Sequence, residues 1–290
     1  MKFKKGVIAA AMTLVLAIGA AGCGNSGNSS SNSGNDGVDV EALLKSANET
    51  MAGVKSMSSN MVMDFAISAE DETMDMVMKA NMDTIYEEPI KLKMDMDLSV
   101  SGETAQAYTM YAVQEGDTMT AYMNIGGDTW YQQPMDISDM SQYNAQSNTE
   151  LYLENLSGFS AEGTEEINGV SSTIITGVLT GDSMKEAIMS SGMESMTASM
   201  GDISEEDIEA IMSDLGDMPV KLWISEDGHV MKYELDMTDM MQKLMTNMMS
   251  QMGQSGEAEG ITVSKMVISM TCDNFDSVED FEIPAEALAA

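Results

Sequence analysis

The sequence has 290 residues and a formal net charge of −35, from 13 Lys+Arg against 48 Asp+Glu. This acidity excludes nucleic acid as a partner, because a polyanion is repelled at every approach. The sequence contains no arginine, which removes the usual bidentate clamp for phosphate or carboxylate. The length suffices for one large domain or two small ones with an ordinary hydrophobic core.

The N-terminus is typical of an exported protein. Lysines within the first five residues precede an apolar run over residues 7–18 and the small-residue segment Ala20-Ala21-Gly22-Cys23. The run is shorter than the roughly 20 apolar residues of a membrane-spanning helix. We therefore expect a signal peptide over residues 1–22.

The segment resembles a bacterial lipobox, with Ala20 where leucine is usual. The resemblance implies that Cys23 becomes the mature N-terminus and carries a diacylglyceryl group, with a further acyl group such as palmitate on its amine. The alternative is an ordinary signal peptide with an incidental cysteine. Lipidation implies a protein on the extracytoplasmic face of the cell membrane, held there by lipid and not by basic charge.

Residues 23–37 form the expected flexible tether, because this stretch consists almost wholly of Gly, Asn and Ser. Residues 38–290 are expected to form a single domain. Its first element is an amphipathic helix from Val38 to about Gly53, since Val40, Leu44 and Ala47 share a helical spacing with other apolar residues.

Alternation with period two then predicts strands, with apolar residues on one face and charged residues such as Asp64, Lys79 and Asp95 on the other. The first half is therefore expected to form an antiparallel meander. A predicted two-residue turn at Asn168-Gly169 and a hairpin around Glu226-Asp227-Gly228 mark further strands. The predicted strands cover 61–67, 74–82, 92–100, 105–114, 118–125, 129–133, 159–167, 170–180, 220–225, 229–237 and 261–273.

Helical spacing of methionines predicts helices over residues 182–212 and a further amphipathic helix over residues 237–252. The expected class is therefore α+β, a long antiparallel sheet with helices on one side.

Several segments resemble the LppX/LprG and LolA-like bacterial lipoproteins. They are Val54-Lys55-Ser56, Gly127-Asp128-Thr129-Trp130-Tyr131, the hairpin over residues 222–233 and Ile283-Pro284. The resemblance implies a strongly curved antiparallel half-barrel with helices covering its concave face. It further implies an apolar cavity for acyl chains and a role as lipid carrier or lipoprotein chaperone.

The chain contains 34 methionines, many of them on the apolar faces of the predicted strands and helices. Methionine is long, unbranched and polarizable, so it repacks around ligands of different shape. The alternative is a core filled with methionine, as a self-filled structural or stress-sensing surface protein would have. The candidate cavity residues are Met61, Met63, Phe65, Met74, Met76, Met78, Met94, Met96, Met241, Met245, Met248, Met266, Ile268 and Met270.

A second alternative is a Cu(I)-binding protein, because thioethers are soft ligands. Met-x-Met spacing places sulfurs on one strand face at Met61/Met63, Met74/Met76/Met78 and Met94/Met96. Amphipathic alternation explains the same positions without a metal.

The sequence predicts no enzyme and no cofactor. His229 is the single histidine, expected to be a solvated turn residue, so no Ser-His-Asp or Cys-His set has support. If Cys23 is acylated, Cys272 has no disulfide partner, and its strand position predicts a buried, unreactive thiol. The expected partners are the membrane, through the lipid anchor, and a hydrophobic ligand; the protein is expected to be a monomer.

Overall fold

The computed structural model describes residues 38–69, 72–116, 118–127, 129–135, 156–181, 210–211, 213–251 and 260–290. The predicted signal peptide, Cys23, the tether and nearly all of the predicted helices over residues 182–212 lie outside these residues. The described helices are α2 (Val40–Ala52), α7 (Thr238–Gln251) and the short α9 (Ala285–Leu288). The strands are β1 (Ser56–Ala69), β2 (Glu72–Ile85), β3 (Lys91–Val100), β4 (Gln106–Glu115), β5 (Thr118–Asn124), β6 (Trp130–Met135), β7 (Leu156–Ile167), β8 (Val170–Leu179), β9 (Met218–Ser225), β10 (Val230–Asp236) and β11 (Ile261–Asp273).

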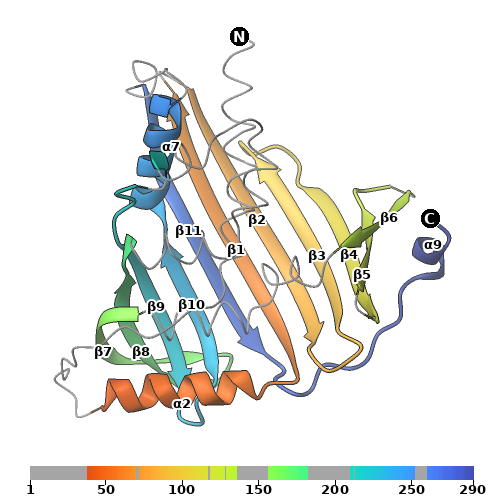
Figure 1. The fold of residues 1–290 in the computed structure, drawn as a ribbon, viewed down its shortest axis with the longest axis horizontal. Helices are drawn as coiled ribbons and strands as arrows, with labels where there is room; N and C mark the ends of the chain where they lie inside the picture. The colour runs from red at the N-terminus through yellow and green to blue at the C-terminus, as the bar shows by residue number, and fades with distance from the viewer. Residues whose placement is uncertain are drawn as a thin grey trace.

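All described strands belong to one 11-stranded sheet with the order β6-β5-β4-β3-β2-β1-β11-β10-β9-β8-β7 (Figure 1). Every neighbouring pair is antiparallel. The first six strands form the predicted meander. The last strand, β11, pairs with β1 at the centre of the sheet and so joins the two halves into one surface.

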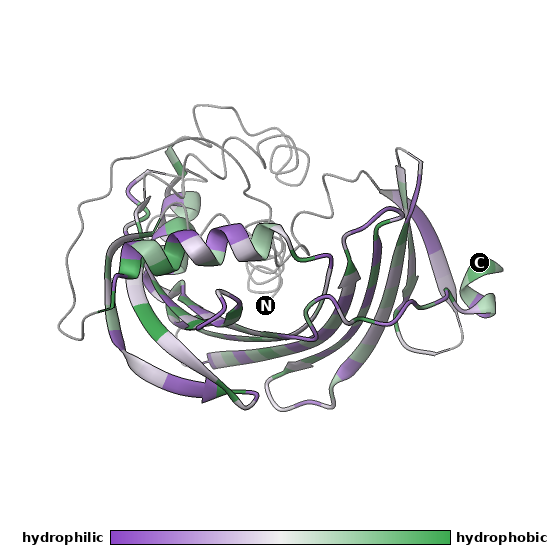
Figure 2. Cartoon of the chain, turned by 90° about the horizontal axis from the view of Figure 1, so that it is seen from below, coloured by the Kyte–Doolittle hydropathy of each residue, from purple (hydrophilic) through white to green (hydrophobic). Residues whose placement is uncertain are grey.

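The sheet is strongly curved, and α2 and α7 lie on its concave side (Figure 2). This confirms the predicted α+β class with a curved antiparallel sheet and helices on one face. The predicted turns are also confirmed where they are described. Asn168 and Gly169 both adopt positive φ, of 50° and 81°, as a type I′ hairpin requires.

Helix α2 begins with an N-cap, because the Asp39 carboxylate accepts a hydrogen bond from the Ala42 amide at 3.1 Å. Its buried face, which includes Leu44, Ala47 and Met51, packs on the end of the sheet. The Met51 sulfur accepts a hydrogen bond from the Val230 amide at 3.4 Å. The helix is therefore seated against the β9–β10 hairpin.

The β9–β10 turn approaches α2 so closely that only glycine fits at its tip. Gly228 has φ of +90°, and a Cβ there would lie 2.5 Å from the Thr50 hydroxyl oxygen and 3.2 Å from the Ser46 carbonyl oxygen. The positive φ and the close approach both require glycine.

We expect Gly228→Ala to destabilise the protein by about 1–3 kcal/mol more than Gly169→Ala, since overpacking adds to backbone strain. Gly169 is the matched control because it has φ of +81° and nothing within 4 Å of an added Cβ. Urea unfolding of both variants gives the difference. Equal losses of unfolding free energy in the two variants would show that the close approach of α2 to Gly228 adds nothing to the cost of the substitution.

The C-terminal segment crosses to the opposite edge of the sheet. Phe281 packs against Tyr111 with ring centroids 6.3 Å apart, and Tyr111 lies 6.0 Å from Trp130. Asp280 pairs with Lys91 at the start of β3. Because Tyr111 alternates with the concave residues Met110 and Ala112, this segment packs on the convex face.

Candidate functional site

The concave face of the sheet is a largely apolar surface formed by alternate residues of neighbouring strands. In β1 the buried residues Met63, Phe65 and Ile67 alternate with the partly exposed Asp64 and Ala66. Phe65 lies opposite Met76 of β2 on one side and Met266 of β11 on the other. The register thus brings the apolar residues of strands distant in sequence onto one side.

Along β3, charge is confined to the other face. In β3 the concave residues Leu92, Met94 and Met96 alternate with Lys93 and Asp95. Convex charges pair with one another or with polar neighbours: Lys265 contacts Asp64 at 2.7 Å, and Thr109 donates a hydrogen bond to Asp95 at 2.9 Å. An apolar molecule on the concave side therefore meets an uncharged surface along β3.

All fourteen candidate cavity residues belong to the same hydrophobic cluster. Ten of them are buried and four are partly buried. The partly buried ones are Met61, Met74, Met96 and Ile268, and the buried ones are Met63, Phe65, Met76, Met78, Met94, Met241, Met245, Met248, Met266 and Met270.

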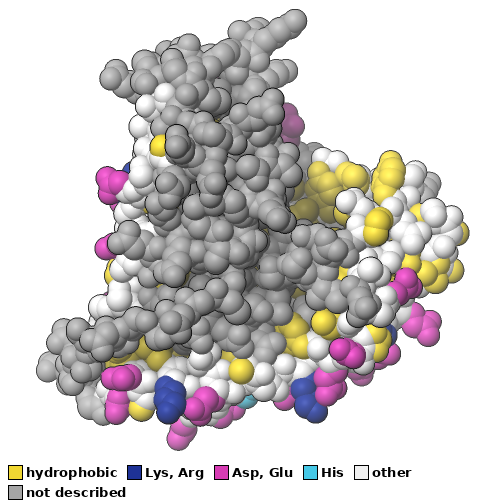
Figure 3. Space-filling model, in the orientation of Figure 1, with side chains coloured by type: hydrophobic (Ala, Val, Ile, Leu, Met, Phe, Trp, Pro, Cys, Tyr) yellow, Lys and Arg dark blue, Asp and Glu magenta, His cyan; other side chains and the backbone are white. Residues whose placement is uncertain are grey.

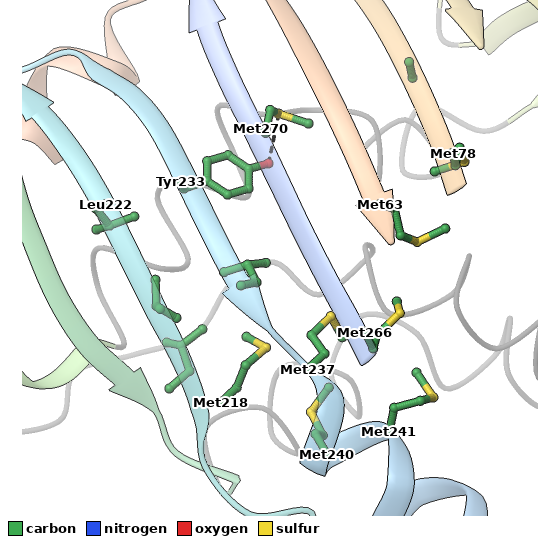
Figure 4. Close-up of a cluster of buried hydrophobic side chains, with 14 of the residues drawn as sticks. Met63, Met78, Met218, Leu222, Tyr233, Met237, Met240, Met241, Met266 and Met270 are labelled. Atoms are coloured by element: carbon green, nitrogen blue, oxygen red, sulfur yellow. Dashed lines mark hydrogen bonds between the residues drawn. The ribbon is translucent and has the colours of Figure 1, made fainter. Parts of the chain in front are cut away.

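Helix α7 supplies three of these residues and packs on β11. Its sheet-facing methionines are almost fully buried, with Met241 at 1 % exposure and Met245 at 3 %. Figure 4 shows Met240 and Met241 beside Met266 and Met237. This end of the face is therefore a packed core beneath the helix, while Met61 and Met96 retain part of their surface.

Methionine sulfur also takes part in polar contacts inside the core. Tyr233, 2 % exposed, donates its hydroxyl to the Met270 sulfur at 3.0 Å (Figure 4). A buried phenol needs a partner, and here a thioether provides one. The cluster is thus held by directed contacts in addition to dispersion.

Several concave residues were absent from the predicted site. Met82, Met110 and Met119 are all buried in the same cluster, as is Leu92. Met82, Met110 and Met119 alternate with Asp83, Tyr111 and Thr118 in strands that the sequence predicts. This alternation could have assigned the three methionines to the concave face. Which residues lie side by side across strands, by contrast, depends on the register.

His229 has a structural role in the β9–β10 turn. Its Nδ1 lies 3.0 Å from the Asp227 carboxylate, and its ring packs against Phe275 with centroids 4.3 Å apart and a tilt of 31°. With its side chain 23 % exposed, it is not the solvated turn residue expected from sequence. The hydrogen bond from the Ser225 hydroxyl holds the pKa of Asp227 below its usual value, and His229 adds to this effect.

Cys272 lies on the concave face opposite Ser59 and is fully buried, as predicted. Burial raises the pKa of its thiol from 9.0 to about 12, and the neighbouring Asp273 carboxylate adds to the shift. The thiol therefore stays protonated and unreactive in the folded protein.

The Cys272 thiol makes stability fall in alkali. The folded pKa lies above the unfolded value, so the contribution is complete below pH 9.0 and is lost as pH rises toward about 12. We expect the difference in unfolding free energy between the parent and Cys272→Ala to shrink across this window. A constant difference would contradict a buried neutral thiol.

In the described ranges no group of three or more His, Cys, Asp or Glu side chains is arranged to hold a metal ion. No described helix is long and apolar enough to cross a membrane.

The surface seen in Figure 3 exposes hydrophobic side chains among acidic ones on the lobe at the right of the view.

The fold and this face together define an open, curved antiparallel sheet with one apolar, methionine-rich side. The chain belongs to the DUF6612 family, a family of unknown function, whose model matches residues 39–290. No curated protein matches the sequence.

Solved structures with a similar arrangement include two mycobacterial lipoproteins. LppX of Mycobacterium tuberculosis is 15% identical, with a TM-score of 0.45 over 84% of this chain and 98% of that one. LprF of Mycobacterium bovis is 12% identical, with a TM-score of 0.45 over 88% and 100%. An outer membrane lipoprotein-sorting domain of Vibrio parahaemolyticus is 9% identical, with a TM-score of 0.22 over 81% and 92%. LppX belongs to the group of lipoproteins that the sequence itself resembles.

Proposed function

We propose that the protein is a lipid-anchored lipoprotein of the extracytoplasmic membrane face that holds a hydrophobic molecule, a lipid or acyl chain, against its concave face. It acts as a carrier or chaperone and needs no catalytic group. Binding of this kind requires no cofactor.

The observation that carries this proposal is the segregation of the sheet's two faces. Charged residues such as Lys93 and Asp97 occupy the convex side, while methionines fill the concave side of the same strands. Met61, Met74 and Met96 pack against the cluster yet keep part of their surface accessible. An apolar ligand has these side chains as its natural contacts.

The energetics favour enclosure of a long acyl chain. Each methylene removed from water contributes roughly 0.8 kcal/mol, so a long chain resists crossing an aqueous gap unless a protein covers it. Methionine side chains adapt to chains of different length and branching at little cost. A sheet face rich in methionine therefore suits a carrier better than it suits a recognition site for one rigid molecule.

The proposed anchor places this surface near a source of ligand. A flexible tether of the length of residues 24–37 has a root-mean-square reach of roughly 20 Å. The domain can therefore approach the membrane to which Cys23 would attach it. The acidic surface leaves the acylated Cys23 as the main source of membrane affinity.

The test is uptake of a fluorescent fatty acid by the full chain carrying Cys23→Ser, which has no covalent acyl group to occupy the face. We expect saturable binding of about one probe per chain and displacement by unlabelled lipid. Absence of uptake by the folded protein would contradict the proposal. It would favour the alternative of a structural lipoprotein whose own side chains fill the face.

A further inference from the structure

One row of the sheet contains methionine on four adjacent strands. Met82 of β2 lies directly opposite Met94 of β3, which lies opposite Met110 of β4, which lies opposite Met123 of β5. Met82, Met94 and Met110 are only 3 %, 8 % and 6 % exposed, and Met123 packs against the same cluster. We call these four residues the methionine row.

The other directly opposed methionines in the described strands form isolated pairs, Met61 with Met270, Met63 with Met78 and Met119 with Met135. The methionine row is therefore not a general consequence of the high methionine content. It depends on register, since a shift of one residue in β3 or β4 would move a sulfur to the convex side.

The geometry of a row favours convergence of its sulfurs. Side chains directly opposite on adjacent strands have Cβ atoms about 4.5–5.5 Å apart, whereas residues i and i+2 of one strand are about 6.8 Å apart. The sheet is curved (Figure 2), and on the inner side of a curved sheet neighbouring side chains converge. Three flexible thioethers from neighbouring strands can thus meet over the central one.

The chemistry of the row selects a narrow class of ions. Its donors are neutral soft sulfurs, and the adjacent charged residues, such as Asp83, Lys93 and Asp95, occupy alternate positions on the other face. Soft thioethers favour Cu(I), whereas Mg²⁺ and Ca²⁺ require oxygen ligands. The net charge of −35 supplies a long-range field that attracts a cation.

We propose that Met82, Met94 and Met110 bind one monovalent soft ion, Cu(I) or its analogue Ag(I), with Met123 available as a fourth ligand. This set differs from the Met-x-Met spacings of single strands, because cross-strand register brings the sulfurs together. The ion binds by coordination alone, with no change of oxidation state. The site does not depend on the proposed binding of lipid.

The experiment is an anaerobic Cu(I) titration of the full chain against a chromophoric chelator, in a Cys23→Ser background that removes the N-terminal thiol. Met94→Leu removes the central sulfur but keeps a similar volume, a swap that costs less than about 1.5 kcal/mol of stability. Met63→Leu is the matched control, because Met63 lies on the same face in an isolated pair. Thermal unfolding verifies that both variants are folded.

We expect one Cu(I) per chain, at least about tenfold weaker binding in Met94→Leu, and no change in Met63→Leu. X-ray absorption spectroscopy of the Cu(I)-loaded parent should show sulfur atoms in the first coordination shell of the copper ion. An affinity of the parent no better than that of free methionine would overturn the site. Equal binding by the parent and Met94→Leu, or an equal loss in Met63→Leu, would overturn it as well.

Discussion

The variant Met96→Asp is expected to take up the fluorescent fatty acid at least about tenfold more weakly than its Cys23→Ser parent, because a carboxylate facing an acyl chain loses hydration without gaining a partner. Met96 lies on the concave face of β3, opposite Ala80 and Tyr108. Its side chain is partly buried, so the folded protein can tolerate the change better than at a core position.

The control for this variant is the next residue along the strand. Asp97 is exposed on the convex face, and Asp97→Asn leaves the concave face unchanged while altering charge by the same magnitude. We expect its probe affinity to equal that of the parent. Met96→Asp adds one negative charge and Asp97→Asn removes one, so affinity shifts of similar size and opposite sign would mean that net charge, not the concave face, governs uptake. Full uptake by a folded Met96→Asp would place the ligand elsewhere.

Replacing Phe65 by Ala is expected to lower the free energy of unfolding by about 3–5 kcal/mol. Phe65 is 1 % exposed on the central strand β1, with Met76 and Met266 directly opposite on its two neighbours. Removal of the ring leaves a cavity where the two halves of the sheet meet. Denaturant unfolding followed by circular dichroism measures the loss.

Tyr131→Ala is the control for this stability prediction, because Tyr131 lies on the edge strand β6 and is 53 % exposed. Its effect should stay within about 0.5 kcal/mol, as is usual for surface substitutions. If Phe65→Ala lowers the free energy of unfolding no more than Tyr131→Ala does, the side chains around the middle of β1 do not form a packed core.

The strands were predictable because their chemistry is local. Apolar and charged residues alternate along Met94, Asp95, Met96 and Asp97. This alternation predicts both an extended strand and which residues share a face. Helix α2 was equally clear from its spacing, and the Asn168-Gly169 turn from residues that accept positive φ. The candidate residues on β1, β2, β3 and β11 therefore share the concave face, and their contact with a ligand stays a prediction.

The sheet's centre and its cross-strand neighbours were not predictable in this way. The pairing of β1 with β11 joins residues as distant as Phe65 and Met266, and no local pattern encodes it. The methionine row likewise depends on the registers of β2 to β5. The sequence prediction of a solvated His229 is wrong because its ring partner Phe275 lies beyond the hairpin, in a segment without a periodic pattern.

Native mass spectrometry of the full chain, extracted from membranes in mild detergent, tests the central proposal most directly. We expect the mass of the protein with its covalent acyl groups on Cys23, plus a lipid in about one-to-one ratio that is released on collisional activation. Cys23→Ser separates the covalent from the bound component. A folded protein that carries no releasable lipid, and takes up none when it is supplied, would contradict lipid binding at the concave face.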